Sequence, residues 1–198
     1  RALGTTVLCT RRQLESPGAD VVFDSEALKL PPPKALKGVT HVLSCIPPAK
    51  NGEDPVLKSL KSELDKLSLQ WAGYLSTTGV YGDCKGKWVT EADQPEPQQP
   101  RSKRRLACEK AWLTSDLPVQ ILRLPGIYGP GRSALQAIST GKSKMIDKPG
   151  QVFSRIHVDD IAGATLHLIN LSAKGKRPLI VNIADDIPTT NTAVLSYA

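Results

Sequence analysis

The sequence predicts an α/β fold in which helices cover both faces of a parallel sheet. Short apolar runs alternate with polar or helix-periodic stretches, as buried parallel strands and their connecting helices do. The length of 198 residues and the 40% hydrophobic content allow one substantial core. We therefore expect a doubly wound sheet, which binds its ligands beyond the carboxyl ends of its strands.

Each expected element follows from the spacing of its apolar residues. The expected strands cover residues 6–10, 41–46, 71–77, 119–124 and 179–184. Apolar residues recur at helical spacing in the segments 55–67, 101–113 and 157–171. Asp159 and Asp160 fall in the first turn of the last helix, where carboxylates stabilise the helix dipole. We expect them to cap this helix and not to form an acid/base pair.

The chain is basic, with a net charge of +7 and an isoelectric point near 9.3. This charge fits a nucleotide cofactor, a phosphorylated substrate or a nucleic acid, and does not choose among them. The basic clusters at 85–88, 101–105 and 174–177 lack the interleaved aromatic residues of a base-stacking platform. Solvated surface is therefore the favoured interpretation, and nucleic acid is not a favoured partner.

Several classes of protein and site are not expected. No apolar stretch approaches the roughly 18 residues needed to cross a bilayer, and the start resembles no secretory signal. We expect no membrane partner and a cytoplasmic location, with an organelle stroma or matrix as the alternative. The cysteines form no CxxC pair and the three histidines lack zinc-ligand spacing. Reduced thiols and no metal site are expected.

Three segments resemble motifs of one known family. They are YLSTTGVYGD at 74–83, ILRLPGIYGPGR at 121–132 and SRIHVDDIAGA at 154–164. In this order they are similar to the fifth strand, the sixth strand with its cofactor-facing loop, and the later VDD helix of extended short-chain dehydrogenase/reductases, the NAD(P)-dependent epimerase/dehydratase superfamily. With VLSCIPP at 42–48 and VVFDSEAL at 21–28, the resemblance covers nearly the whole chain. The first two segments are most similar to the atypical, YeeZ-like branch.

The resemblance implies one Rossmann-like NAD(P)-binding domain over residues 1–198, with 131–154 and 185–198 in a small substrate-binding lobe. Thr10, Arg11 and Arg12 lie where such folds contact the adenosine ribose. Guanidinium groups match a 2′-phosphate, which favours NADP over NAD, although two exposed surface arginines are an equally good explanation. The other cofactor-binding residues that the resemblance implies are Asp24, Ser44, Ile46, Pro47, Arg105, Pro125, Gly126 and Tyr128.

The resemblance also implies catalytic and substrate-binding residues. Thr77 aligns with the family's catalytic Ser/Thr, and Tyr81 is a nearby phenol. The hydroxyls of Thr77 and Thr78 could bind a carbonyl or a sugar hydroxyl, with Arg132 and Arg155 gripping an anionic substrate. The alternative is that the hydroxyls only end the strand by bonding to nearby backbone.

Two family motifs are not recognisable in the chain. The positions of the YxxxK pair are occupied by Arg101 and Arg105, and a guanidinium cannot act as an acid at neutral pH. No GxGxxG turn precedes the first expected strand. We therefore expect that the first family strand and its phosphate loop are missing from these residues.

These observations favour an NAD(P)-binding, epimerase/dehydratase-like oxidoreductase that acts on an unknown small-molecule substrate. Whether it is an enzyme stays open, because standard catalysis is not encoded. The alternatives are a catalytically inactive cofactor sensor or RNA-binding protein on the same fold, and an assembly or scaffold factor. A homodimer is an open alternative to a monomer.

Overall fold

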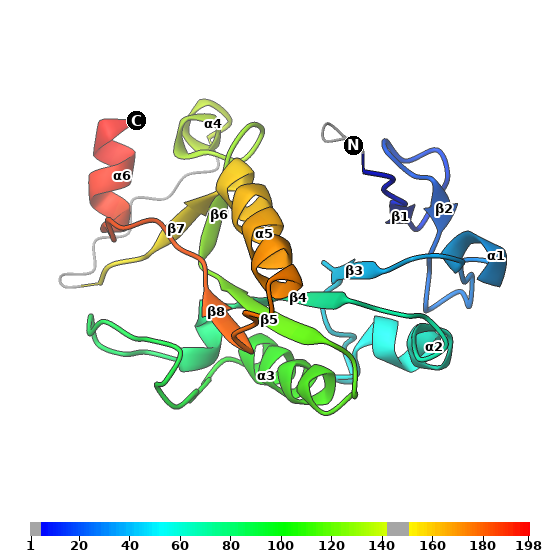
Figure 1. The fold of residues 1–198 in the computed structure, drawn as a ribbon. Coiled ribbons are helices and arrows are strands. Elements are labelled where there is room, and N and C mark those ends of the chain that lie inside the picture. Colours follow the sequence, from blue (N-terminus) through cyan, green and yellow to red (C-terminus); the bar gives the residue numbers. More distant parts are fainter. Residues whose placement is uncertain (1–4, 142–150) are drawn as a thin grey trace.

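A four-stranded parallel sheet forms the centre of the computed structural model, which describes residues 5–141 and 151–198 (Figure 1). Its strands are β3 (His41–Ser44), β4 (Trp71–Thr77), β5 (Val119–Leu124) and β8 (Ile180–Asn182), in the order β3-β4-β5-β8. Each neighbouring pair is parallel. The predicted α/β class with a parallel sheet is therefore confirmed.

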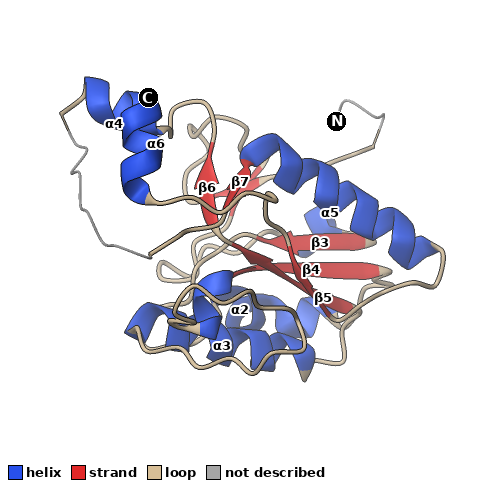
Figure 2. Cartoon of the chain, turned by 90° about the vertical axis from the view of Figure 1, so that its left-hand side faces the viewer, coloured by secondary structure: helices blue, strands red, loops and turns tan. Residues whose placement is uncertain are grey.

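Helices cover both faces of this sheet (Figure 2). The helices α2 (Pro55–Leu64) and α3 (Pro100–Leu113) lie on one face, and α5 (Val158–Ala173) lies on the other. The Asp54 carboxylate starts α2 by accepting hydrogen bonds from two backbone N–H groups, as an N-cap does. Asp159 and Asp160 lie in the first turn of α5, as predicted.

The two faces have separate apolar cores. Tyr74, Trp112 and Ile121 lie in the core under α2 and α3, where the rings of Tyr74 and Trp112 stack with centroids 5.7 Å apart. Trp71 and Leu122 lie in the core under α5. Alternate residues of β4 and β5 thus point into opposite cores, as the period of two in a strand requires.

The N-terminal part departs from the expected strand over 6–10. The strand β1 covers only Thr10–Arg11 and pairs in parallel with β2 (Val21–Val22), apart from the four-stranded sheet. The longer strand was wrong because the pairing with β2 begins only at Thr10; residues Val7 and Leu8 before it are 40% and 37% exposed. A short helix, α1 (Pro33–Leu36), follows β2.

A smaller group of elements lies beside the sheet (Figure 1). It contains the parallel pair β6 (Gly126–Tyr128) and β7 (Arg155–His157), with the helices α4 (Ala134–Ser139) and α6 (Asn191–Tyr197) in contact with each other. The proposed lobe segment 131–154 includes 142–150, which lie outside the described residues. That 131–154 and 185–198 bind substrate stays a prediction. None of the described helices is long and apolar enough to cross a membrane.

Candidate functional site

The neighbouring strands β3 and β4 each end at a hydroxyl residue. Ser44 of β3 pairs with Tyr74, so β4 continues three residues further, to Thr77. Ser44 ends β3; it is buried, and its Oγ has no hydrogen-bond partner in the described structure. Thr77 ends β4 and is half-buried. Its Oγ1 accepts a hydrogen bond of 3.1 Å from the Gly79 N–H, which starts the 3-10 helix η1 (Thr78–Tyr81). The predicted local backbone bond is present, and it leaves the Thr77 O–H free to donate.

Arg105 on α3 ties these two strand ends together. Its Nη1 donates hydrogen bonds to the carbonyl oxygens of Ile46 at 3.3 Å and Leu75 at 2.8 Å. The same nitrogen donates to Tyr74 Oη at 3.0 Å, and the guanidinium lies 5.5 Å from the Tyr74 ring centroid. Its Nε and Nη2 have no partner among the described residues, so the side chain keeps donors for a ligand.

Positive charge gathers near the ends of β1 and β3. Desolvation raises the pKa of the Cys45 thiol, whereas the charges of Arg11 and Arg105 act to lower it. Both arginines therefore lie near Cys45, the residue that follows β3. Burial likewise raises the pKa of the Tyr74 phenol, so this tyrosine stays protonated at neutral pH.

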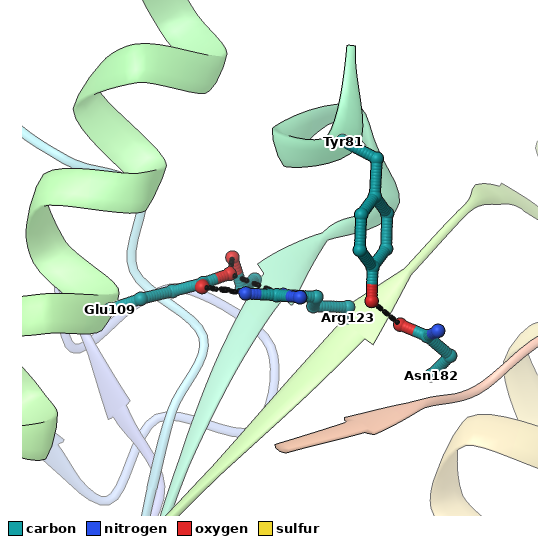
Figure 3. Close-up of polar contacts among 5 residues, drawn as sticks. Tyr81, Glu109, Arg123 and Asn182 are labelled. Atoms are coloured by element: carbon teal, nitrogen blue, oxygen red, sulfur yellow. Dashed lines mark hydrogen bonds and ion pairs between the residues drawn. The ribbon is translucent and has the colours of Figure 1, made fainter. Parts of the chain in front are cut away.

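A buried ion pair joins α3 to β5 near the carboxyl end of β5 (Figure 3). Arg123 on β5 donates from Nη2 to Glu109 Oε2 at 2.7 Å and from Nε to Glu109 Oε1 at 3.1 Å. Their side chains are only 2% and 1% exposed. Ser76 donates a further hydrogen bond to Glu109, while Arg123 Nη1 has no partner in the described structure. The network therefore links α3, β4 and β5.

Tyr81 extends this network toward β8. Its ring centroid lies 4.8 Å from the Arg123 guanidinium, and its Oη donates to Asn182 Oδ1 at 2.9 Å. Burial alone would lower the pKa of Arg123, but the hydrogen bonds to Glu109 and the contact with Tyr81 raise it. Because the Tyr81 side chain is buried and its proton is engaged, the geometry favours a supporting role, and its catalytic role stays a prediction.

The predicted adenosine contacts lie at the N-terminal pair of strands. Arg11 and Arg12 are exposed, and among the described residues Arg11 Nη1 donates only to the neighbouring Thr10 carbonyl, at 3.0 Å. Asp24 Oδ1 accepts from the backbone N–H groups of Glu26 and Ala27. Asp24 therefore caps a turn, and its contact with adenine stays a prediction.

The remaining predicted residues are less grouped. Pro47 follows β3 on the surface, Thr78 begins η1, and Pro125 connects β5 to Gly126, the first residue of β6. Tyr128 packs edge-on against His157, with ring centroids 5.2 Å apart.

The two arginines predicted to bind substrate differ in their freedom. Arg132 is exposed and closes a backbone bridge with Gly129. Arg155 Nη1 donates to the Phe153 carbonyl and to Thr189, so much of its hydrogen-bonding capacity is used inside the smaller group of elements. Arg132 is therefore freer than Arg155 to meet a ligand.

Sequence reasoning missed the importance of Glu109, Arg123 and Asn182. A signal for the first two was present, because Arg123 is the charged residue of a strand with four apolar residues and Glu109 occurs among the apolar residues of α3. Opposite charges in two buried elements usually pair, since an isolated buried charge is costly. Asn182 carried no such signal.

A nicotinamide dinucleotide fits part of this arrangement. The unpartnered Ser44 hydroxyl, the spare donors of Arg105 and the nearby charge of Arg11 can hold ribose or phosphate oxygens. No glycine-rich turn joins a strand to a helix within residues 5–141 and 151–198, so the expected origin of the pyrophosphate contacts is not tested. The same residues hold no cluster of three or more potential metal ligands.

Solved structures share this fold. A conserved protein of unknown function from Silicibacter pomeroyi is 35% identical, with a TM-score of 0.81 over 99% of this chain and 70% of that one. A putative NAD-dependent epimerase/dehydratase from Methylobacillus flagellatus is 26% identical, with a TM-score of 0.78 over 99% and 72%. The dTDP-glucose 4,6-dehydratase of Bacillus anthracis, solved in complex with NAD, is 20% identical, with a TM-score of 0.71 over 92% and 64%.

Several of these structural neighbours are Rossmann-fold proteins of the NAD-dependent epimerase/dehydratase family. This chain belongs to the same family as the conserved Silicibacter pomeroyi protein, whose function is unknown. No protein-family model and no curated protein matches the sequence.

Proposed function

We propose that this protein binds a nicotinamide dinucleotide across the carboxyl ends of β3 and β4 and acts as an atypical epimerase/dehydratase-like oxidoreductase. The observation that carries the proposal is Arg105, which joins the two strand ends and keeps unpartnered donors beside them. Ligands of doubly wound sheets bind at this edge. The neighbour solved with NAD supports the same class of cofactor.

In this proposal the chain's residues bind the dinucleotide and polarise the substrate, and they have a smaller part in proton transfer. The nicotinamide, when bound, supplies hydride chemistry. The free Thr77 O–H would donate to a substrate carbonyl or sugar oxygen, since its Oγ1 already accepts from Gly79. Arg101 and Arg105 are permanently charged, so a proton must come from another group or from solvent.

Calorimetric titration of NAD and NADP tests the cofactor site. Arg105→Ala should weaken both dinucleotides by about tenfold or more, because a charge-assisted contact is lost. Lys103→Ala, an exposed cation on the same helix, is the matched control and should bind like wild type. Equal affinities for wild type and Arg105→Ala would reject the site.

Arg11 and Arg12 support a preference for NADP, whereas the ligand named for the Bacillus anthracis neighbour is NAD. If the arginines contact a 2′-phosphate, Arg11→Ala and Arg12→Ala should weaken NADP by about tenfold to a hundredfold and leave NAD nearly unchanged. Equal losses for the two cofactors would contradict the preference.

Turnover with NADPH and a panel of aldehydes, ketones and nucleotide sugars tests the role of Thr77. Thr77→Ala should lose most of the rate, and Thr77→Ser, which keeps the hydroxyl, should recover it. A full rate in Thr77→Ala would remove the assigned role. If wild type turns over nothing, the cofactor-sensing alternative becomes the better account.

A further inference from the structure

The hydroxyl of Ser102 lies close to Thr77 and has no part in the contacts described above. Ser102 belongs to the first turn of α3, and only 5% of the residue is exposed. A Cβ at Gly79 would lie 3.0 Å from Ser102 Oγ and 3.3 Å from Thr77 Oγ1. The two hydroxyls therefore border one small space beside Gly79, and the contact of α3 with η1 keeps them there.

Ser102 differs from the other helical hydroxyl residues in what its oxygen contacts. A serine or threonine of a helix commonly donates to a backbone carbonyl of the preceding turn. The hydroxyls of Thr114, Ser115 and Thr165 do so, at 3.0, 2.6 and 2.7 Å. Ser102 Oγ makes no hydrogen bond to any described residue, and it is not among the unpartnered polar atoms that are sealed from solvent. A buried residue thus presents a free hydroxyl at the space beside Gly79.

Thr77 presents a second hydroxyl to the same space. Its Oγ1 accepts from the Gly79 N–H at 3.1 Å, which leaves the Thr77 O–H free to donate. Two O–H groups, one from α3 and one from the end of β4, can therefore donate to a single oxygen placed between them.

Gly79 keeps this space open. It lies in η1 and is not among the glycines with positive φ, so its backbone conformation suits other residues as well. A side chain there would instead crowd the two hydroxyls. Gly79 is also exposed, so the space opens to solvent and a ligand can enter it.

The charge nearby favours an electron-rich ligand atom. Arg105 lies three residues after Ser102, so the two side chains share one face of α3. That face meets β4, because Arg105 Nη1 donates to the Leu75 carbonyl at 2.8 Å. A guanidinium on the same helix face as the hydroxyls stabilises an oxygen that gains negative charge.

We propose that Ser102 is a second donor to the substrate oxygen, which it holds together with Thr77 in the space beside Gly79. The inference rests on the proposed oxidoreductase function and adds a residue to it. Two donors fixed in advance stabilise a carbonyl oxygen most when negative charge develops on it. The arrangement suits an aldehyde or ketone oxygen, which can accept both hydrogen bonds at once.

Binding of a ketone without turnover tests the pair of hydroxyls directly. The carbon-13 signal of a carbonyl moves downfield when its oxygen accepts hydrogen bonds. Cyclohexanone labelled at the carbonyl carbon is therefore titrated against the 198-residue chain, without cofactor and again with saturating NADP in its oxidised form, which cannot reduce it. We expect a saturable downfield shift with wild type.

Four variants locate the origin of this shift. Ser102→Ala and Thr77→Ala should each lower the shift at saturation, since each removes one donor. Gly79→Ala should weaken binding by about tenfold or more, because its methyl group enters the space between the hydroxyls. Ser62→Ala removes an exposed serine from α2 and should behave like wild type.

Stability separates a binding role of Ser102 from a structural one. Ser102→Ala removes a buried hydroxyl that has no protein partner, so urea unfolding should show equal or slightly higher stability. A marked loss of stability in Ser102→Ala would instead assign the hydroxyl to the fold.

Kinetics supply a further readout with any carbonyl compound that wild type reduces. Ser102→Ala should lower kcat by about tenfold or more with KM nearly unchanged, because the hydrogen bond strengthens as charge develops on the oxygen. Ser102→Cys, which keeps a weak donor, should recover part of the rate. Calorimetric titration of NAD and NADP should give wild-type affinities for Ser102→Ala.

Two results would overturn the proposal. One is the absence of a saturable carbonyl shift with wild type, and the other is an equal shift in wild type and folded Ser102→Ala. Failure of the proposed function has a different signature: neither dinucleotide binds, while the carbonyl shift and its loss in Ser102→Ala persist. Dinucleotide binding and turnover that are unchanged in Ser102→Ala would keep the proposed function and remove Ser102 from it.

Discussion

The two faces of the four-stranded sheet are covered to different extents, and β3 shows this most clearly. On the face under α2 and α3, Val42 packs against the core and Ser44 is buried. On the face under α5, Leu43 of the same strand is 41% exposed. Because neighbouring residues of a strand alternate between faces, one strand can be half core and half surface. Coverage by helices, not strand composition, decides which side chains become core.

The better-covered face also holds the buried charges. Glu109, Arg123 and Ser76 lie between the sheet and α3, and Tyr81 packs on the Arg123 guanidinium. Buried charges are tolerated only when they are paired with an opposite charge. The arrangement of Glu109 and Arg123 provides that pairing on the face of the sheet that α2 and α3 cover. It lies next to Thr77 and therefore supports the strand end that the proposed function uses.

The largest effect on stability is expected from breaking the buried ion pair. Glu109→Ala should lower the free energy of unfolding by about 3 to 5 kcal/mol, because it leaves the Arg123 charge buried and uncompensated. Urea unfolding followed by circular dichroism measures the loss. Lys61→Ala removes an ion pair from the surface of α2 and serves as the control, with little expected change. A similar small change for Glu109→Ala would show that the network is not needed for folding.

The next effect compares the two faces directly. Ile121→Ala, on the face covered by α2 and α3, should lower the free energy of unfolding by about 2 to 5 kcal/mol, since it opens a cavity in a packed core. Leu43→Ala, on the open side of β3, should cost less than about 1 kcal/mol. Matched urea titrations of the two variants measure the difference. If both variants lose the same stability, another part of the protein covers Leu43 in solution.

Gly73→Ala should have an intermediate effect on the α5 face. A Cβ at this glycine would lie 2.1 Å from the Trp71 ring, whose Nε1 is held by Gln120 Oε1. The indole must therefore move, at a cost of about 1 to 3 kcal/mol. Near-ultraviolet circular dichroism and thermal unfolding report the displaced ring and the lost stability. An unchanged tryptophan spectrum would contradict the close packing of Trp71 on Gly73.

The smallest effect concerns the reactivity of the buried Cys108 thiol, on the face of the sheet that α2 and α3 cover. Burial raises the pKa of Cys108 to about 11. The thiol of the unfolded chain has a pKa of 9.0, so above this pH the unfolded chain releases the proton while the folded protein still holds it. The free energy of unfolding therefore falls as the pH rises from 9.0 toward about 11. At pH 8 a thiol reagent should modify the exposed Cys45 faster than Cys108, as measured by peptide mass mapping. Equal rates would mean that α3 opens readily.

Local sequence patterns determined the parallel sheet and its main helices. The apolar runs at 41–46, 71–77 and 119–124 became β3, β4 and β5, and the periodic leucines of 55–67 became α2, which ends at Leu64. Such patterns can be recognised in the sequence because the spacing of hydrophobic residues in a helix or strand depends only on residues close along the chain. The strand expected over 6–10 was reduced to β1, because its extent depends on where β2 pairs with it, and its own residues do not reveal that.

Only the tertiary structure decided which polar groups meet. The hydrogen bond from Tyr81 to Asn182 joins residues 101 positions apart, and the one from Arg105 to Ile46 spans 59. Their distances depend on the crossovers between strands and on which face of α3 meets the sheet, and no local pattern encodes either. Ser102 illustrates the same point, because its hydroxyl comes close to that of Thr77 only where α3 packs against the turn at Gly79. Periodicity therefore predicts the scaffold, while long-range contacts place its reactive and binding groups.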